Sequence, residues 1–171
     1  MTGKMRVVFA AALFFGIAIG SAATSIARAD DLDGQTRQDF IDALAPKTRG
    51  LTVATEQPPQ KDMRIQFEFG SAELTASARQ VLDELGAALQ SDELSSFQFS
   101  LVGHTDAVGS DAANLSLSEA RAQAVKSYLS GQFQIDPARL EASGVGEADL
   151  ADPADPNNGI NRRVVITNIG S

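Results

Sequence analysis

The sequence predicts an α/β (α+β) two-layer sandwich, in which a mixed βαβαββ sheet carries its helices on one face. Short stretches that alternate polar and apolar residues, typical of half-buried strands, are followed twice by longer stretches with apolar residues three and four apart, typical of amphipathic helices. Two further strand-like stretches come after the second helix. This order favours one sheet with both helices packed on the same side.

The first βα unit begins with an alternating stretch. Residues 64–69 (Arg-Ile-Gln-Phe-Glu-Phe) predict a strand that ends at Gly70. Apolar residues then recur at intervals of three and four, which predicts a helix over about residues 75–90 with Thr75 as its N-cap.

The second βα unit repeats this pattern. Phe97, Phe99 and Leu101 alternate and predict a strand that ends in a polar loop beginning Gly-His-Thr-Asp at residues 103–106. A second helix is expected after the loop and ends near Gly131. Its expected apolar face consists of Leu117, Ala120, Ala124, Val125, Tyr128 and Leu129.

Two strands close the sheet. Residues 139–145 predict a short third strand, and residues 163–169 predict a last strand rich in Val and Ile. The acidic, Pro- and Asn-containing stretch 146–159 between them is expected to be a loop.

The first 29 residues have the layout of a secretory signal peptide. Lys4 and Arg6 precede an apolar stretch over residues 7–20, and Ala27-Arg28-Ala29 supplies small residues at the cleavage site. An uncleaved anchor is the alternative, but about 14 strongly apolar residues would span only ~21 Å of a ~30 Å hydrocarbon core. We therefore expect export to the periplasm of a Gram-negative bacterium, possible outer-membrane association, and no membrane-spanning segment after cleavage.

Composition and net charge limit the kinds of partner that this protein is expected to bind. The chain has no cysteine, so neither a disulfide nor a lipidated thiol is expected. Loss of Lys4, Arg6 and Arg28 with the signal would change the net charge from −8 to −11. Such an acidic protein is not expected to bind nucleic acid or anionic lipid as its main partner.

Residues 30–61 are expected to lie outside the compact domain, which would comprise residues 62–171. Phe40, Ile41 and Leu44 predict a short amphipathic helix that Pro46 ends, and residues 47–61 predict a linker. The helix either packs on the domain, the favoured interpretation, or serves as a docking element.

Arg121 interrupts the apolar face of the second helix. On a helical wheel with Leu117 at zero it falls at about 40°, between Tyr128 and Leu129. A buried guanidinium keeps its proton and requires an accepting partner. The nearest candidate in the expected topology is Asp106, at the end of the strand that precedes the helix, where ligand crevices of α/β sheets often open.

Two interpretations of this pair remain open. Asp106 and Arg121 could form a structural ion pair that binds nothing. Alternatively, the carboxylate could accept an ammonium while the guanidinium binds a carboxylate, so that the two hold a zwitterion such as a free amino-acid centre.

The residues around this pair resemble the OmpA-like domain family, the peptidoglycan-binding domain found in outer membrane protein A, Pal and MotB type proteins. The resemblance covers essentially all of residues 62–169. It is carried by Phe67, Ser71 and Leu74, by Gly103-His104-Thr105-Asp106, Gly109 and Asn114, by Leu117-Ser118, Arg121-Ala122 and Val125, and by Gly144-Val145-Gly146-Glu147 and Asn161-Arg162-Arg163-Val164.

The resemblance implies non-covalent binding of peptidoglycan through the diaminopimelate of its stem peptide. Asp106 would contact the amino group of diaminopimelate and Arg121 its carboxylate. Asn114 would add hydrogen bonds, Arg162 would lie at the rim, and Thr105 belongs to the same implied set.

Other chemistry is weakly indicated. His104 is the only histidine, so a metal site lacks ligands and hydrogen bonding within the loop is the expected role. The acids around Asp152 lack the spacing of an EF-hand loop, so an acidic surface insertion is preferred to a calcium site. No cofactor is expected, nor a hydrolase, which needs two poised carboxylates or an activated nucleophile.

The leading hypothesis is therefore a non-catalytic peptidoglycan-binding protein that supports envelope integrity, with an outer-membrane or envelope protein as a possible second partner. The alternative is a protein–protein scaffold that recruits an envelope complex through the helix around Phe40 and Leu44.

Overall fold

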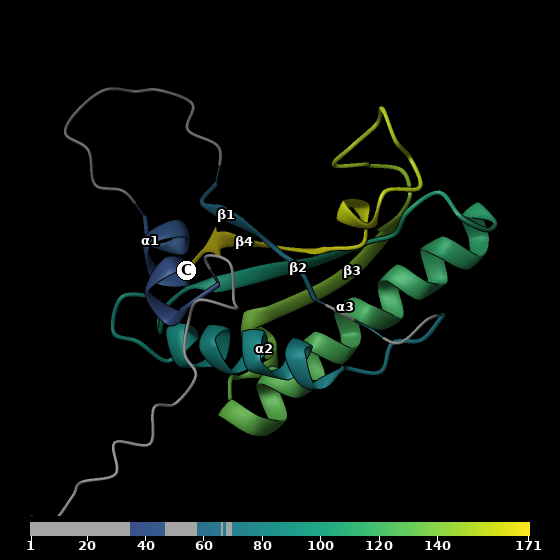
Figure 1. Ribbon diagram of the computed structural model, residues 1–171. Coiled ribbons are helices and arrows are strands. Elements are labelled where there is room, and N and C mark those ends of the chain that lie inside the picture. The colour runs from purple at the N-terminus through teal and green to yellow at the C-terminus, as the bar shows by residue number, and fades with distance from the viewer. Residues whose placement is uncertain (1–34, 47–57, 66, 68–69) are drawn as a thin grey trace, which may run out of the picture.

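The computed structural model describes residues 35–46, 58–65, 67 and 70–171 (Figure 1). The predicted signal peptide, residues 1–29, and most of the predicted linker lie outside these residues. Within the described part of the chain, no helix combines the length and apolar character needed to cross a membrane.

Four strands form one mixed sheet in the order β1-β4-β2-β3. They are β1 (Gln60–Met63), β2 (Gln98–His104), β3 (Leu140–Gly146) and β4 (Val164–Gly170). β2 and β3 are parallel, whereas β4 runs antiparallel to both β1 and β2. The predicted βαβαββ order and mixed sheet are confirmed.

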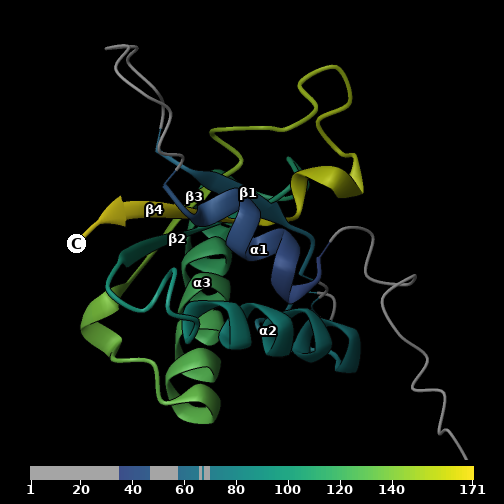
Figure 2. The ribbon, with the colours of Figure 1, turned by 90° about the vertical axis from the view of Figure 1, so that its left-hand side faces the viewer.

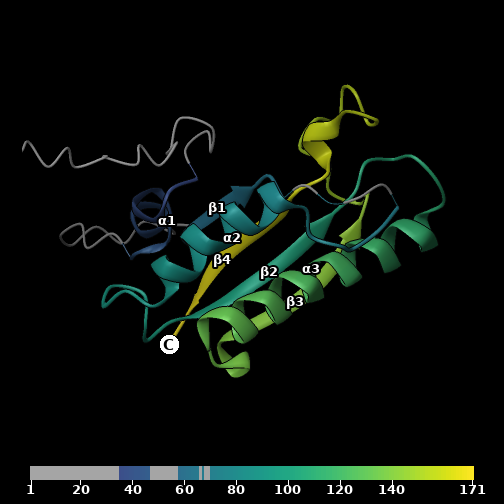
Figure 3. The ribbon, with the colours of Figure 1, turned by 60° about the horizontal axis from the view of Figure 1, so that its bottom comes forward.

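Two long helices cover one face of this sheet (Figures 1 and 3). They are α2 (Ala76–Leu89) and α3 (Asp111–Phe133), and two short 3-10 helices, η1 (Pro137–Arg139) and η2 (Gly159–Asn161), precede β3 and β4. Thr75 caps α2 as predicted, because its hydroxyl accepts a hydrogen bond from Ala78 N at 3.2 Å. The two-layer arrangement is therefore confirmed.

The N-terminal helix α1 (Arg37–Leu44) is part of the same packed body, between α2 and β1 (Figure 2). Phe40 and Leu44 are fully buried in the common core. Asn168 of β4 donates from Nδ2 to the carbonyl of Leu44 at 2.9 Å, which ties the end of the helix to the sheet. The favoured interpretation, that this helix packs on the domain, is confirmed.

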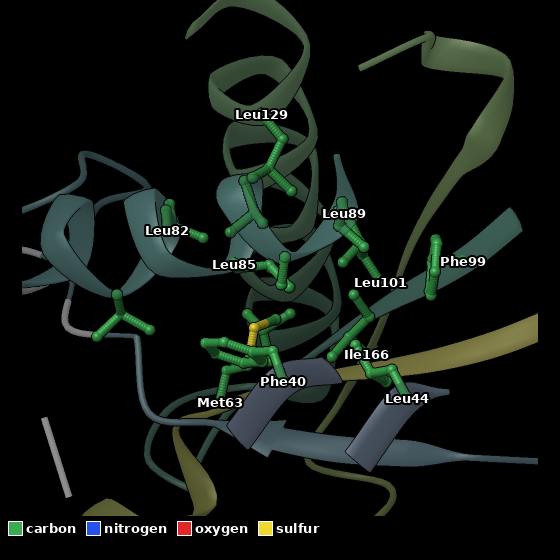
Figure 4. Close-up of a cluster of buried hydrophobic side chains, with 14 of the residues drawn as sticks. Phe40, Leu44, Met63, Leu82, Leu85, Leu89, Phe99, Leu101, Leu129 and Ile166 are labelled. Carbon is green, nitrogen blue, oxygen red and sulfur yellow. The ribbon is translucent and has the colours of Figure 1, made fainter. Parts of the chain in front are cut away.

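The core lies between the sheet and the three helices (Figure 4). Each layer contributes large apolar side chains to it. The largest that are fully buried are Phe40, Phe99, Leu44, Met63, Leu82, Leu85, Leu89, Leu94, Leu101, Leu129, Leu140 and Ile166.

The first strand differs from the prediction. It spans Gln60–Met63 rather than residues 64–69, and only an isolated bridge between Phe67 and Leu74 is found further along. Met63 pairs with Val164, the first residue of β4. β4 therefore has no residue left to pair with the chain after Met63. The packed unit therefore begins before residue 62, the position at which the domain was expected to start.

The second helix also differs from the prediction. α3 begins at Asp111 because Ser110 caps it, accepting from Ala113 N at 3.3 Å. Ala120 is exposed, whereas Ser118 is fully buried against the sheet. Gly103 and Gly144 make this close approach possible: an added Cβ would come within 2.2 Å of the Ser118 and Glu119 backbone, respectively.

Candidate functional site

A cavity of about 590 Å³ opens beside the N-terminal half of α3. Segments that are distant in sequence build it: the chain after β1, the cap of α2, α3, and η2 with the residue after it. Its lining residues are Arg64, Ile65, Phe67, Thr75, Arg121, Gly159, Ile160 and Arg162. Three guanidinium groups therefore face one hollow, an arrangement suited to anionic groups.

Arg121 is the most buried of these cations, with only 6% of the residue exposed. Its Nε donates to the carbonyl of Ser71 at 3.1 Å, and its guanidinium lies 4.9 Å from the centre of the Phe67 ring. Burial lowers the pKa of Arg121, as does the nearby Arg162, while Asp106 opposes the shift. The residue stays a cation, because arginine does not lose its proton in proteins.

Asp106 pairs with a different arginine from the one predicted. Its Oδ2 lies 2.6 Å from Nη1 of Arg162, and its Oδ1 accepts from Val108 N at 3.3 Å. Among the described residues, Arg121 has no carboxylate within ion-pair distance. The structural ion pair considered between Asp106 and Arg121 is therefore wrong, and Arg162, expected only at the rim, is the direct partner of the acid.

Asp106, Asn114 and Thr105 are not among the residues that line the cavity. Asn114 is buried, and its Nδ2 donates to the carbonyl of Asp106 at 3.2 Å and to the carboxylate of Glu147. Thr105 is buried as well, and its N donates to the carbonyl of Gly146 at 2.9 Å. These contacts fix the loop that carries Asp106, and the ligand contacts implied for Asn114 and Thr105 stay predictions.

The acidic loop before β4 is built around Asn161, which is completely buried. Its Oδ1 accepts from Asp152 N at 2.8 Å, and its Nδ2 donates to the carbonyls of Asp155 and Pro156 at 3.1 Å. Ala107 N donates to the carbonyl of Pro156 at 3.0 Å, which joins this loop to the one that carries Asp106. The loop thus presents η2 and Arg162 to the cavity.

His104 orders this region, as predicted. Its Nδ1 lies 3.0 Å from the carbonyl of Asp149 and must carry the proton, because a carbonyl only accepts. Burial, followed by the charge of Arg163, lowers the pKa of His104, so the imidazole is neutral at neutral pH. Within residues 35–46, 58–65, 67 and 70–171, no three His, Cys, Asp or Glu side chains are grouped to hold a metal ion.

Sequence reasoning missed Arg64 and Ile160 as lining residues. Arg64 was predicted as a polar position of a strand, and Ile160 lies between the predicted loop, residues 146–159, and the predicted last strand. No local pattern marks either one, because they meet only when the chain after β1 lies beside η2. Phe67, by contrast, belonged to the set that carried the family resemblance.

Comparison with known proteins identifies the family. Residues 66–164 match the model of the OmpA family. This chain belongs to the OmpA family. Outer membrane protein A of Serratia marcescens is 35% identical over 137 residues, which cover 77% of this chain and 38% of that relative. The chain thus aligns with less than half the length of this curated OmpA relative.

Solved structures of OmpA-like domains show the same fold. A putative MotB-like protein from Desulfovibrio vulgaris superposes with a TM-score of 0.55 and 29% identity, covering 66% of this chain and 73% of that one. The peptidoglycan-associated lipoprotein of Burkholderia pseudomallei gives a TM-score of 0.52 and 25% identity, covering 61% and 87%, respectively.

Proposed function

We propose that this OmpA-family chain is a non-catalytic periplasmic protein of a Gram-negative bacterium that binds peptidoglycan through the diaminopimelate of the stem peptide and so supports envelope integrity. The observation that carries the proposal is the buried guanidinium of Arg121 in the cavity wall, together with Arg162, which lines the same cavity and pairs with Asp106. The names of two relatives, an outer membrane protein and a peptidoglycan-associated lipoprotein, also support it.

The amino-acid centre of diaminopimelate is a zwitterion, and Arg121 suits its carboxylate. Arg121 uses its Nε on the carbonyl of Ser71, and its terminal amino groups make no hydrogen bond with the described residues. Those two groups form the fork that binds a carboxylate in a bidentate manner.

Asp106 suits the ammonium of the same ligand. One carboxylate oxygen contacts Arg162 and the other accepts from Val108 N. An ionised carboxylate offers about four lone-pair sites, so an ammonium can bind without displacing Arg162. The pair therefore preorients the acid before the ligand arrives.

Affinity for a single site should be modest. The ligand and the cavity are both charged and hydrated, and each loses water on binding. A sacculus presents the same peptide many times, so rebinding along the wall raises retention. Sedimentation with sacculi is consequently a better assay than a single-site titration.

The test is co-sedimentation of the full chain with purified sacculi. Wild type should pellet, whereas Arg121→Met and Asp106→Asn should stay largely in the supernatant. Arg37→Ala removes an exposed arginine from α1, away from the cavity, and should pellet like wild type. Circular dichroism at the assay temperature checks that each variant is folded.

Two results would contradict the proposal. One is wild-type protein that stays in the supernatant, and the other is folded Arg121→Met and Asp106→Asn protein that pellets as well as wild type. The supernatants should also contain no soluble muropeptides, since cleavage of the wall would contradict a non-catalytic role.

The alternative function, a protein–protein scaffold, required α1 to present Phe40 and Leu44 at the surface. It used α1 around Phe40 and Leu44 to recruit an envelope complex, but both side chains are fully buried in the core. A partner could reach them only by unpacking α1. No other described feature favours this second function.

A further inference from the structure

A second, smaller cavity of about 180 Å³ adjoins the first. The two share Arg64 and Ile160 in their walls, so a ligand that lies in the larger cavity can extend past these residues into the smaller one. The smaller cavity is lined by Gln35, Lys61, Asp62, Arg64, Ala151, Ile160 and Arg163.

Arg163 gives this cavity an unsatisfied donor. The residue is only 8% exposed, and its terminal amino groups lie 3.3 Å from the carbonyl and 3.4 Å from the carboxylate of Asp149. Its Nε is buried and has no hydrogen-bond partner among the described residues. A buried donor without an acceptor is costly, so this group favours an acceptor that enters the cavity.

The acids near Arg163 neutralise it only weakly. Asp62 Oδ1 lies 3.9 Å from Nε, beyond hydrogen-bond reach, and the side chains of Asp62 and Asp149 are both mostly exposed. Ion pairs with solvated carboxylates contribute little to stability, because water screens them. Lys61 and Arg64 add two further cations to the wall, so the cavity is positive overall.

The positive charge of the two cavities contrasts with the negative net charge of the whole chain. The sequence has a net charge of −8, yet Lys61, Arg64, Arg121, Arg162 and Arg163 line the two adjoining cavities. In the described part of the chain, the remaining lysines and arginines are Arg37, Arg79, Lys126 and Arg139. Among the described residues, the two cavities therefore gather most of the cations and favour anions.

The N-terminal segment completes the smaller cavity. Gln35 directly precedes Thr36, the N-cap of α1, and its buried side chain accepts from Arg64 N at 3.0 Å. This bond holds the backbone of Arg64 at the wall that the cavities share. Docking of α1 therefore shapes the site as well as the core.

We propose that the smaller cavity is a subsite for a second carboxylate of the same wall peptide, held by Arg163, Lys61 and Arg64. The proposal rests on the proposed binding of diaminopimelate in the larger cavity. In a stem peptide the residue before diaminopimelate is a glutamate linked through its side-chain carboxyl, which leaves its α-carboxylate free. That carboxylate carries the charge that the cations of the adjoining cavity favour, and it belongs to the residue directly next to diaminopimelate.

The test compares two dipeptides by NMR on the full chain: γ-D-glutamyl-meso-diaminopimelate and its counterpart with the glutamate α-carboxylate amidated. The Nε–Hε signal of Arg121 reports the larger cavity and that of Arg163 the smaller one. The acid should shift both signals and bind roughly fivefold to tenfold more tightly, whereas the amide should shift Arg121 alone. Inorganic phosphate, titrated separately, is the control for unspecific anion binding.

A matched pair of variants links this preference to the cavity. Lys61→Gln should reduce the difference between acid and amide, because Arg163 and Arg64 remain, while keeping the Arg121 shift. Lys126→Gln removes a lysine of α3 that lines neither cavity and should keep the difference.

Each other outcome overturns the subsite in a distinguishable way. Equal affinities with shifts of Arg121 alone would refute the subsite and leave peptidoglycan binding intact. No shift of Arg121 with either dipeptide would refute both proposals. A shift of Arg163 by phosphate as strong as that by the acid dipeptide would indicate an adventitious ion only.

Discussion

Replacing Phe40 by alanine tests whether α1 folds together with the OmpA-family core. Phe40 is 0% exposed and packs in the same cluster as Met63 of β1 and Leu85 of α2 (Figure 4). Truncation of a buried phenylalanine costs about 3–5 kcal/mol. A domain of this size has a total stability of ~5–15 kcal/mol, so the loss is a large fraction of it.

The assay is urea unfolding followed by far-UV circular dichroism, together with thermal melting. Phe40→Ala should lower the free energy of unfolding by about 3–5 kcal/mol and Tm by about 6–20 °C. Gln38→Ala, at an exposed position of the same helix, should change stability by less than about 0.5 kcal/mol. If Phe40→Ala matches Gln38→Ala to within 1 kcal/mol or so, α1 is not part of the cooperative unit.

Two further predictions concern the packing of α3 and the buried histidine. Gly103→Ala should destabilise the protein by more than about 2 kcal/mol, since the added Cβ would clash with the Ser118 carbonyl. Gly131→Ala, where an added Cβ meets no other atom within 4 Å, should be neutral or stabilising by up to ~1 kcal/mol. Equal urea unfolding midpoints for the two variants would contradict this prediction. Because burial lowers the pKa of His104 below its usual 6.5, the unfolded chain binds the proton more readily. The free energy of unfolding should therefore be highest above pH ~6.5 and should fall as the pH drops towards 5, by at most ~1.4 kcal/mol per pH unit. His104→Gln should lose less stability than wild type over the same range. Equal losses in the two proteins would contradict this prediction.

The sequence predicted the site in part. The helical wheel correctly indicated that Arg121 is buried, because burial of a helix face follows from a periodicity that the chain carries locally. Its counter-ion was predicted wrongly. Asp106 lies just after the strand that precedes α3, but Arg162, 56 positions further along the chain, reaches it from the folded loop before β4.

Local patterns were enough for the order of strands and helices, the cap at Thr75 and the charged residue on α3, since propensity, capping and periodicity act over a few neighbouring positions. The partners of those residues required the folded chain. The pairing of β1 with β4, the close contact of α3 with Gly103, and the row of cations around Arg64 all join segments far apart in sequence. These contacts depend on how the sheet and the helices pack. A pattern of neighbouring residues in the sequence does not show which distant segments meet.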